Sequence, residues 1–501
     1  MTPPPLFPPR YEPIGTLGKG GGGEVWSVRD RITGKTVALK TLGEDADEPE
    51  VLALVREAAA LSGVEGLGVP RVLRFGRLSG SGRPFMVREL VDGTSLADLL
   101  ARRGDLARNL AAIADAADQL TRLHRALLLH GDVKPANIIV GDGGRATLVD
   151  LGLAAPFRDG GARPLGLTPR YAAPELFKGD PLTVRAEVFA LGATIAEALR
   201  DSEGERDPKV VDALQAVVDR ATARDPNARY PSADELANAL RRAARLPCGP
   251  HEEAARPDAD AGARPDAGAD AVVWPIVGLD APSTRLLAQI MGLPAGGGLS
   301  IEGPSGSGRS ALLRRIAWSL EVGGYGVAWV EAASVADPRE ALAIELSGHD
   351  PGRVTALVDD ADRLGDAALE RLDEVRKAGG KLVLVLGAQA QNTQGAAATP
   401  ARAALAGRGF ERLEMAPLDE QVARELVQRT IPSLSDAVAA HVVARAGRWP
   451  GRIRDIVARI ARAPVASTED VDRLLDAPPA SGAAASGPGG AGADGSALPA
   501  A

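Results

Sequence analysis

The sequence predicts a multidomain protein with two globular segments, each of which mixes β-strands and α-helices. Three observations support this prediction. The 501 residues are too many for one hydrophobic core, because a domain usually holds about 100–200 residues. Residues 247–271 carry two copies of Ala-Arg-Pro-Asp-Ala and too little apolar surface to fold. Strand-like and helix-like stretches alternate on both sides of this segment.

Six segments are expected along the chain: a disordered lead at 1–10, a first domain at 11–246, a disordered linker at 247–272, an α/β domain at 273–416, a helical segment at 417–476 and a disordered tail at 477–501. The lead is rich in proline, and the tail contains almost only Ala, Gly, Ser and Pro. Both compositions are typical of segments that stay unfolded.

Composition and charge exclude several classes of protein. The formal net charge of -8 argues against a dedicated nucleic-acid-binding protein, which normally carries a basic field. Cys248 is the only cysteine, so no disulfide forms within the chain, and a reducing compartment fits. Residues 1–10 do not resemble a signal peptide, and no apolar run reaches the roughly 18 residues of a membrane span. We therefore expect a cytoplasmic protein without a membrane span.

A glycine-rich run at 18–25, GKGGGGEV, lies between two strand-like stretches. Its G-x-G-x-x-G-x-V pattern is formed by Gly18, Gly20, Gly23 and Val25. Glycines allow a backbone to approach phosphate oxygens and to point N–H groups at them. By itself such a run is more often a flexible turn, so its interpretation depends on the residues that follow.

A lysine and a glutamate follow at a spacing that favours phosphate binding. Lys40 ends the short apolar strand 37–40, where its amino group can hold ATP phosphates. Glu57 lies in the helical stretch 50–61 and can pair with Lys40. Either residue alone would be read as a solvated surface charge.

The segment His130–Asn137, HGDVKPAN, is the most specific feature of the sequence. Asp132 is suited to accept the proton of a substrate hydroxyl, and Lys134 to neutralise charge on a transferring phosphoryl group. Asn137 and Asp150 are suited to bind Mg²⁺. Phosphoryl transfer needs positioning and charge compensation, which these residue types supply.

Together these motifs resemble the eukaryotic-like (Hanks-type) Ser/Thr protein kinases of bacteria over about residues 11–245. The resemblance implies an α+β bilobal protein-kinase fold and ATP and Mg²⁺ as cofactors. It also implies transfer of the γ-phosphoryl group of ATP to Ser/Thr hydroxyls of protein substrates.

The same resemblance implies the role of further residues. Backbone groups near Glu89 and Val91 are expected to bind adenine between Val25 and Ala38. Thr168 opens the run TPRYAAPE and is expected to contact Asp132 and Lys134.

Two departures from the family pattern agree with each other. Gly131 replaces the arginine that normally pairs with a phosphorylated activation loop. Residues 151–167 contain no Ser, Thr or Tyr. We therefore predict an enzyme that is not activated by phosphorylation of this loop.

Two other positions differ from the family pattern as well. Glu187 replaces the aspartate that holds the catalytic-loop backbone, and its longer side chain puts the loop geometry in question. Arg88 occupies the position that lies at the back of the ATP site in this family. It can compete with Lys40 for Glu57 or extend outward, and the second orientation is preferred because burial of a charge is costly.

A second phosphate-binding loop is predicted at 303–310, GPSGSGRS. It follows a strand-like stretch and precedes a helical pattern, as such a loop requires. Gly303, Gly308 and Ser310 fit the pattern G-x-x-x-x-G-K-[ST], but Arg309 replaces the lysine. Arginine keeps the charge but is larger and hydrated differently, so the exchange is not conservative.

Two acids end the next apolar strand, at 355–360. Asp359 is suited to hold Mg²⁺ with Ser310, and Asp360 lies where a water-activating acid is expected. The region 273–476 resembles AAA-like and STAND-type P-loop NTPases, which implies an α/β P-loop NTPase domain with a small helical lid. It is either a weak nucleotide-binding switch or a degenerate domain kept for protein contacts.

Two functions remain open from the sequence. The first is a bacterial signalling kinase regulated by its second domain. The alternative is a catalytically weak, kinase-like and NTPase-like scaffold that binds nucleotide and partners. ATP and protein substrates are the expected partners, with no nucleic acid; the oligomeric state is left open.

Overall fold

The computed structural model describes residues 7–20, 23–43, 46–63, 68–78, 81–156, 161–162, 164, 166–202, 207–247, 280–386, 410–431, 434–460 and 467–476. The tail predicted at 477–501 and all but Pro247 of the linker predicted at 247–272 lie outside these residues.

The first lobe is a five-stranded antiparallel sheet with one helix. The strand order is β1-β2-β3-β5-β4. Its elements are β1 (Tyr11–Gly20), β2 (Gly23–Asp30), β3 (Thr36–Thr41), α1 (Glu48–Gly63), β4 (Val72–Arg77) and β5 (Pro84–Glu89). β3 lies in the middle of the sheet and five of its six residues are buried, so Lys40 starts from a rigid backbone.

The second lobe is mainly helical. Its elements are β6 (Thr94–Ser95), α2 (Leu96–Ala101), α3 (Leu106–Arg125), β7 (Leu128–Leu129), β8 (Ile138–Val140), β9 (Ala146–Leu148), β10 (Ala155–Pro156), α4 (Val184–Asp201), α5 (Pro208–Ala221) and α6 (Ala233–Ala244). α3 begins after Asp105, whose side chain caps the helix by accepting from the N–H of Arg108. A buried pair between Asp118 and Arg241 joins α3 to α6 at 2.6 Å. Since β7 and β8 flank the run His130–Asn137, these strands fix its position.

The second domain contains a parallel five-stranded sheet in the order β12-β13-β14-β11-β15. Its elements are α8 (Asp280–Gly292), β11 (Gly298–Glu302), α9 (Arg309–Val322), β12 (Gly326–Glu331), α10 (Pro338–Leu346), β13 (Val354–Asp359), α11 (Asp366–Ala378), β14 (Lys381–Val385) and β15 (Glu411–Glu414). Because these strands are parallel, the loops after β11 and β13 lie at the same edge of the sheet.

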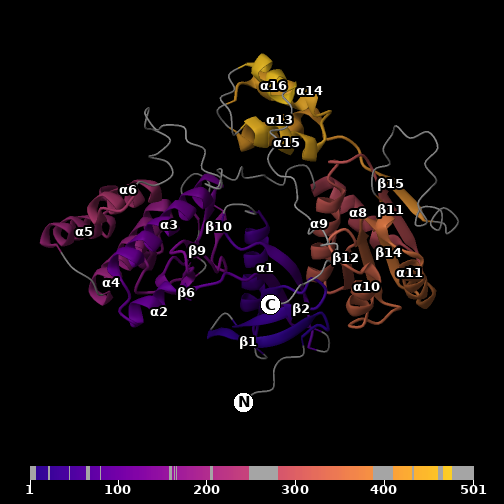
Figure 1. Cartoon of the computed structure of the whole chain (residues 1–501), viewed down its shortest axis with the longest axis horizontal. Helices are drawn as coiled ribbons and strands as arrows, with labels where there is room; N and C mark the ends of the chain where they lie inside the picture. The colour runs from indigo at the N-terminus through magenta and orange to yellow at the C-terminus, as the bar shows by residue number, and fades with distance from the viewer. Residues whose placement is uncertain are drawn as a thin grey trace, which may run out of the picture.

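Four further helices form a group of their own, drawn in yellow and light orange in Figure 1. They are α13 (Glu420–Thr430), α14 (Asp436–Arg445), α15 (Pro450–Ile460) and α16 (Thr468–Asp476). Their apolar faces share one core that includes Leu426, Val442, Val457 and Val471. Within the described residues, no helix is both long enough and apolar enough to cross a membrane.

The first lobe lies between the helical lobe and the second domain (Figure 1). α9 contacts β4, and Arg74 of β4 pairs with Glu345 of α10 at 2.7 Å. Residues 7–10 differ from the expectation of a disordered lead at 1–10. Phe7 packs edge-on against Trp26, with ring centroids 5.5 Å apart, and Arg10 binds Asp30. These contacts compensate for the ordering of a proline-rich segment, which local composition cannot reveal.

Candidate active site

Lys40 and Glu57 come from two elements of the first lobe and meet in its interior. Lys40 Nζ of β3 lies 2.7 Å from Glu57 Oε2 of α1 and 3.3 Å from Asp150 Oδ1. Burial alone would lower the pKa of Lys40, but the charges of Glu57 and Asp150 outweigh burial and raise it. Lys40 is therefore a charged ammonium group held between two carboxylates.

Asp132 is the centre of a second group of hydrogen bonds. Thr168 Oγ1 donates to Asp132 Oδ1 at 2.6 Å. Lys134 Nζ lies 2.6 Å from Asp132 Oδ2 and 3.3 Å from Thr168 Oγ1. Asn137 Nδ2 donates to the backbone oxygen of Asp132 at 2.8 Å and to its Oδ2 at 3.1 Å. Such a carboxylate, with a lysine beside it, can accept a proton from a hydroxyl while the lysine compensates charge.

Asn137 and Asp150 are suitable ligands for Mg²⁺. Asn137 uses its amide nitrogen to bind Asp132, which leaves its carbonyl oxygen for a metal ion. Burial would raise the pKa of Asp150, but the charge of Lys40 and the N–H of Gly152 lower it, so Asp150 is a carboxylate. Its side chain is 42% exposed, and therefore accessible to a ligand. Hard oxygen ligands of this kind fit Mg²⁺.

The glycine-rich run lies on the hairpin between β1 and β2. The predicted residues on these two strands are Gly18, Gly20, Gly23 and Val25. Val25 is opposite Lys40 in the sheet, so the hairpin lies beside the lysine. Gly23 has φ +105°, and a Cβ there would lie 2.3 Å from the backbone oxygen of Thr41. Glycine is therefore required at this position by the backbone geometry, and it also allows the backbone to approach a phosphate closely.

A buried ion pair fixes the segment that follows Thr168. Arg229 donates to both carboxylate oxygens of Glu175, at 2.6 Å and 2.7 Å, and its guanidinium lies over the ring of Phe189. This bidentate geometry is the strongest form of an Arg–carboxylate contact. The pair holds the end of residues 168–175 against α4 and thereby supports the position of Thr168.

The second phosphate-binding loop lies between β11 and α9, but its arginine is turned onto the protein backbone. Arg309 Nη1 donates to the backbone oxygens of Gly303 and Leu386, both at 2.5 Å. Gly308 has φ +89° and caps α9 without a side-chain hydrogen bond. The charge of Arg309 is therefore directed at carbonyl groups of the protein rather than left for a phosphate.

The acids predicted for this second site lie next to the loop. Ser310 hydrogen-bonds Asp359 at the end of β13. Burial, opposed in part by this bond, raises the pKa of Asp359, and the charge of Asp360 adds to the rise. Asp360 follows at once in a left-handed conformation, with φ +49°. The structure thus brings Ser310, Asp359 and Asp360 together.

The first turn of α15 lies directly on the second phosphate-binding loop. The N–H of Gly451 donates to the backbone oxygen of Gly306 at 2.8 Å. A Cβ at Gly451 would lie 2.7 Å from Gly306 Cα, so only glycine allows this approach. The sequence shows the Trp-Pro-Gly-Arg run at 449–452, but no local pattern shows which loop it contacts.

Family models match two parts of this chain. The model of the protein kinase domain matches residues 11–239, the part that holds Lys40, Asp132 and Asp150. Residues 11–239 are a protein kinase domain. The model of Novel STAND NTPase 5 matches residues 291–400, so an NTPase domain follows the kinase domain.

Curated relatives of the kinase domain are bacterial Ser/Thr protein kinases. The DNA damage-responsive serine/threonine-protein kinase RqkA of Deinococcus radiodurans is 35% identical over 205 residues, which are 39% of this chain and 30% of RqkA. Serine/threonine-protein kinase PknD of Mycobacterium tuberculosis is 32% identical over 257 residues, 45% of this chain and 38% of PknD. PknB of Mycolicibacterium smegmatis is 32% identical over 270 residues, 47% of this chain and 43% of PknB. The chain thus spans less than half of each relative.

The catalytic loop of the kinase domain is held by Glu187, as its position suggests. Glu187 Oε1 accepts from the N–H of Gly131 at 2.7 Å, and its Oε2 lies 2.6 Å from His124 Nε2. The extra methylene of glutamate therefore does not prevent contact with the loop. His124 is a supporting residue that the sequence did not reveal, because α3 and α4 are far apart along the chain.

Arg88 lies on β5 opposite Ala38 and is half-buried, so its side chain is neither fully enclosed nor fully solvated. Its Nε atom is buried without a hydrogen-bond partner among the described residues. Burial raises the pKa of Glu57, and the charges of Lys40 and then Arg88 oppose this effect. Lys40 nevertheless keeps the hydrogen bond to Glu57. The structure therefore shows no competition between Arg88 and Lys40 for a hydrogen bond to Glu57.

The region predicted to bind adenine lies at the end of β5. Ala38 is buried, and Val25 and Val91 are half-buried. Glu89 uses its N–H to donate to the backbone oxygen of Arg71, and its side chain binds Arg71 too. These contacts, together with its pairing to Val37 of β3, fix the backbone of Glu89 where adenine is expected to bind.

Proposed function

We propose that this chain is an ATP-dependent Ser/Thr protein kinase in bacterial signalling. The observation that carries the proposal is the group of hydrogen bonds around Asp132. Thr168, Lys134 and Asn137 all contact this residue, while Lys40 is paired with Glu57. Both groups must be formed for phosphoryl transfer, and both are present at once.

The residues divide the work of the reaction. Mg²⁺, held by Asn137 and Asp150, would neutralise the phosphate charge of ATP. Asp132 accepts the proton of the attacking hydroxyl, and Lys134 compensates the charge that develops on the transferring group. Lys40 orients the phosphates, while Gly18, Gly20 and Gly23 cover them.

The test is transfer of labelled phosphate from ATP to the chain itself or to a generic protein substrate. We expect signal from the wild type and a reduction of at least about 100-fold in Asp132→Asn, because a general base contributes about 10²–10⁴-fold. Asp212→Asn, an exposed aspartate on α5, is the matched control and should keep full activity. Equal signal from wild type and Asp132→Asn would remove the catalytic assignment of Asp132 and favour the alternative, a catalytically weak, kinase-like and NTPase-like scaffold.

For the NTPase domain we propose weak nucleotide binding with slow or absent hydrolysis. The support is Arg309, whose Nη1 atom binds the oxygens of Gly303 and Leu386. Asp359 and Ser310 are the proposed Mg²⁺ ligands, and residues 417–476 the proposed lid, since α15 contacts Gly306.

Arg309→Lys tests this assignment in the full chain, in an Asp132→Asn and Lys40→Met background that removes the kinase site. Lysine reaches phosphate as a point charge, so nucleotide affinity should rise about tenfold or more. If Arg309→Lys and its parent both fail to bind ATP at millimolar concentration, the domain is degenerate and its role is contact with protein.

A further inference from the structure

Arg74 of β4 is the centre of a buried contact between the kinase domain and the NTPase domain. Its Nη1 atom donates to both oxygens of Glu345 on α10, at 2.8 Å and 2.7 Å. Its Nη2 atom donates to the backbone oxygen of Val327 at 2.8 Å and lies 3.1 Å from Glu321 on α9. The side chains of Arg74 and Glu345 are only 10% and 3% exposed. Ion pairs on a protein surface, which contribute little to stability, are far more exposed than this pair.

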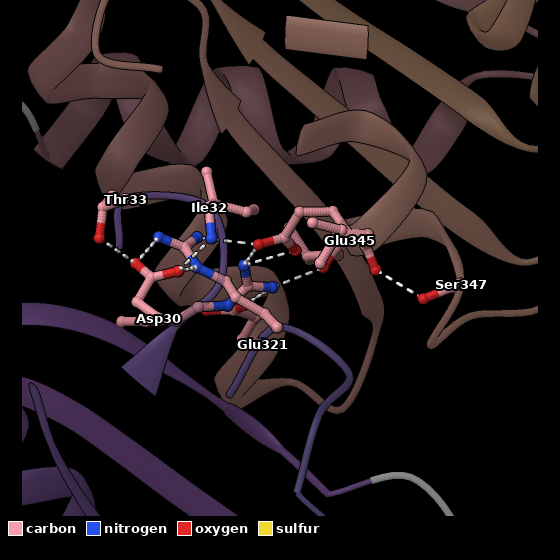
Figure 2. Close-up of polar contacts among 10 residues, drawn as sticks. Asp30, Ile32, Thr33, Glu321, Glu345 and Ser347 are labelled. Carbon is pink, nitrogen blue, oxygen red and sulfur yellow. Dashed lines mark hydrogen bonds and ion pairs between the residues drawn. The ribbon is translucent and has the colours of Figure 1, made fainter. Parts of the chain in front are cut away.

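A second arginine reinforces the same carboxylate. Arg10 donates to Glu345 Oε1 at 2.8 Å and forms two hydrogen bonds with Asp30, at 2.8 Å and 2.7 Å. Asp30 also accepts from Thr33 Oγ1 and from the N–H of Ile32, as Figure 2 shows. The turn between β2 and β3 is thereby held against the NTPase domain.

The charges of this cluster are nearly balanced. Two guanidinium groups face three carboxylates, those of Asp30, Glu321 and Glu345. Burial raises the pKa of Glu321 to about 8, with Arg74 opposing the rise and Glu345 adding to it. Burial would also raise the pKa of Glu345, but Arg74 and Arg10 lower it. With Glu321 protonated, two cations face two anions.

Apolar side chains connect this contact to the helix that carries Glu57. The rings of Phe75 and Trp318 meet edge to face with centroids 6.4 Å apart. Phe75 belongs to the same buried core as three residues of α1, Leu54, Ala58 and Leu61, and two residues of α9, Trp318 and Val322, pack against this core. One continuous core thus reaches from α9 through β4 to α1.

We propose that the NTPase domain docks on the kinase N-lobe as a positioning partner, in which α9 and α10 hold β4 and α1 so that Glu57 stays paired with Lys40. This inference rests on the proposed kinase function. Docking of the NTPase domain supplies a form of control that the activation segment lacks. Residues 151–167 have no hydroxyl to phosphorylate, and Gly131 has no side chain that could bind a phosphate. Arg74, Glu345 and Trp318 are positioning residues, since they act through β4 and α1.

The experiment uses the full chain and the variants Arg74→Ala, Glu345→Ala and the double variant. Hydrogen exchange of peptides covering β4 and the C-terminal half of α9 reports docking, and labelled-phosphate transfer reports activity. We expect faster exchange in both peptides and a loss of kcat of about 5–150-fold in each variant, the usual range of coupling between sites. The double variant should lose less than the product of the two single losses, because the two residues contact each other and their effects are not independent.

Matched variants separate this effect from general damage. Glu374→Ala breaks an exposed pair with Arg371 in the same domain and should leave both readouts unchanged. Trp318→Leu removes the ring contact with Phe75 without uncovering a charge, and should lower kcat even if the alanine variants fold poorly. Unchanged exchange in β4, or full kcat in a variant whose β4 exchanges faster, would overturn the proposal. If the wild type transfers no phosphate, the kinase function fails instead, while the exchange data still report whether the domains dock.

Discussion

Gly131 adopts φ +83°, in the left-handed region that favours glycine. A Cβ there would lie 2.1 Å from the backbone oxygen of Leu153. The absence of an arginine at this position is therefore more than the loss of a phosphate-binding side chain, because the backbone around the catalytic loop is built for glycine.

The protonation of buried charged groups also depends on their surroundings. Lys40 is stabilised as a cation by its two carboxylates, whereas Glu321 lies among mixed charges and favours its neutral form at neutral pH.

Gly131→Ala should lower the free energy of unfolding by more than about 2 kcal/mol, because strain in the left-handed region alone costs about 1–2 kcal/mol and a backbone clash is added. Gly179→Ala is the matched control, since φ is +87° there but no atom lies within 4 Å of a Cβ. Urea unfolding of the two variants checks this. Equal losses would contradict the close contact with Leu153.

Glu321→Gln should make stability depend less on pH between about 4.5 and 8. The pKa of Glu321 is raised from 4.5 in the unfolded chain to about 8 in the folded protein. In this window the folded state binds more protons, so wild-type stability falls as pH rises, by up to about 1.4 kcal/mol per pH unit from this group. Glutamine does not titrate, so this contribution disappears. Thermal unfolding of both proteins from pH 5 to pH 8 measures it, and parallel curves would contradict the raised pKa.

In the kinase domain, short strands and helix residues hold the loops of the candidate site in place. β7 and β8 flank the catalytic loop, while α4 supplies Glu187 to its backbone. α9 has a role at each of its ends. Its N-terminal end carries Arg309 and the second phosphate-binding loop, and its C-terminal half carries Trp318 and Glu321 against β4.

Glu187→Ala should lower kcat and reduce stability by about 1–3 kcal/mol, since it leaves the N–H of Gly131 without its partner. Asp201→Ala, at the exposed end of the same helix, is the control and should change stability by less than about 0.5 kcal/mol. Steady-state kinetics and urea unfolding give the two quantities. Wild-type kcat in Glu187→Ala would show that another contact holds the loop.

The first lobe of the kinase domain lies between the helical lobe and the NTPase domain (Figure 1). The sequence left contact between the two domains open, because the segment between them is long enough to keep them apart. The structure joins them through Arg10 and Arg74, two residues that are 335 and 271 positions from Glu345. No periodicity or motif spacing indicates pairing over such a separation.

Treatment of the whole chain with a phosphatase should leave its kinase activity unchanged within about twofold. Residues 151–167 contain no Ser, Thr or Tyr, so the activation segment cannot carry an activating phosphate before Thr168. Activity before and after treatment, with a kinase known to require loop phosphorylation as positive control, measures this. A large loss of activity would show that a phosphate elsewhere in the chain controls the enzyme.

The sequence was enough to predict a phosphate-handling site at Lys40, Asp132, Asn137 and Asp150 and a second loop at 303–310, because each motif depends on short spacings that local backbone geometry preserves. The absence of Ser, Thr and Tyr from residues 151–167 was likewise visible in the sequence. The three-dimensional structure was needed to see how Glu187 reaches the loop, which carbonyl groups Arg309 binds, and that Arg10 is held by Asp30 and Glu345. These outcomes depend on burial and on the charges of distant elements, and a side chain's neighbours across an interface are not written in its own stretch of chain.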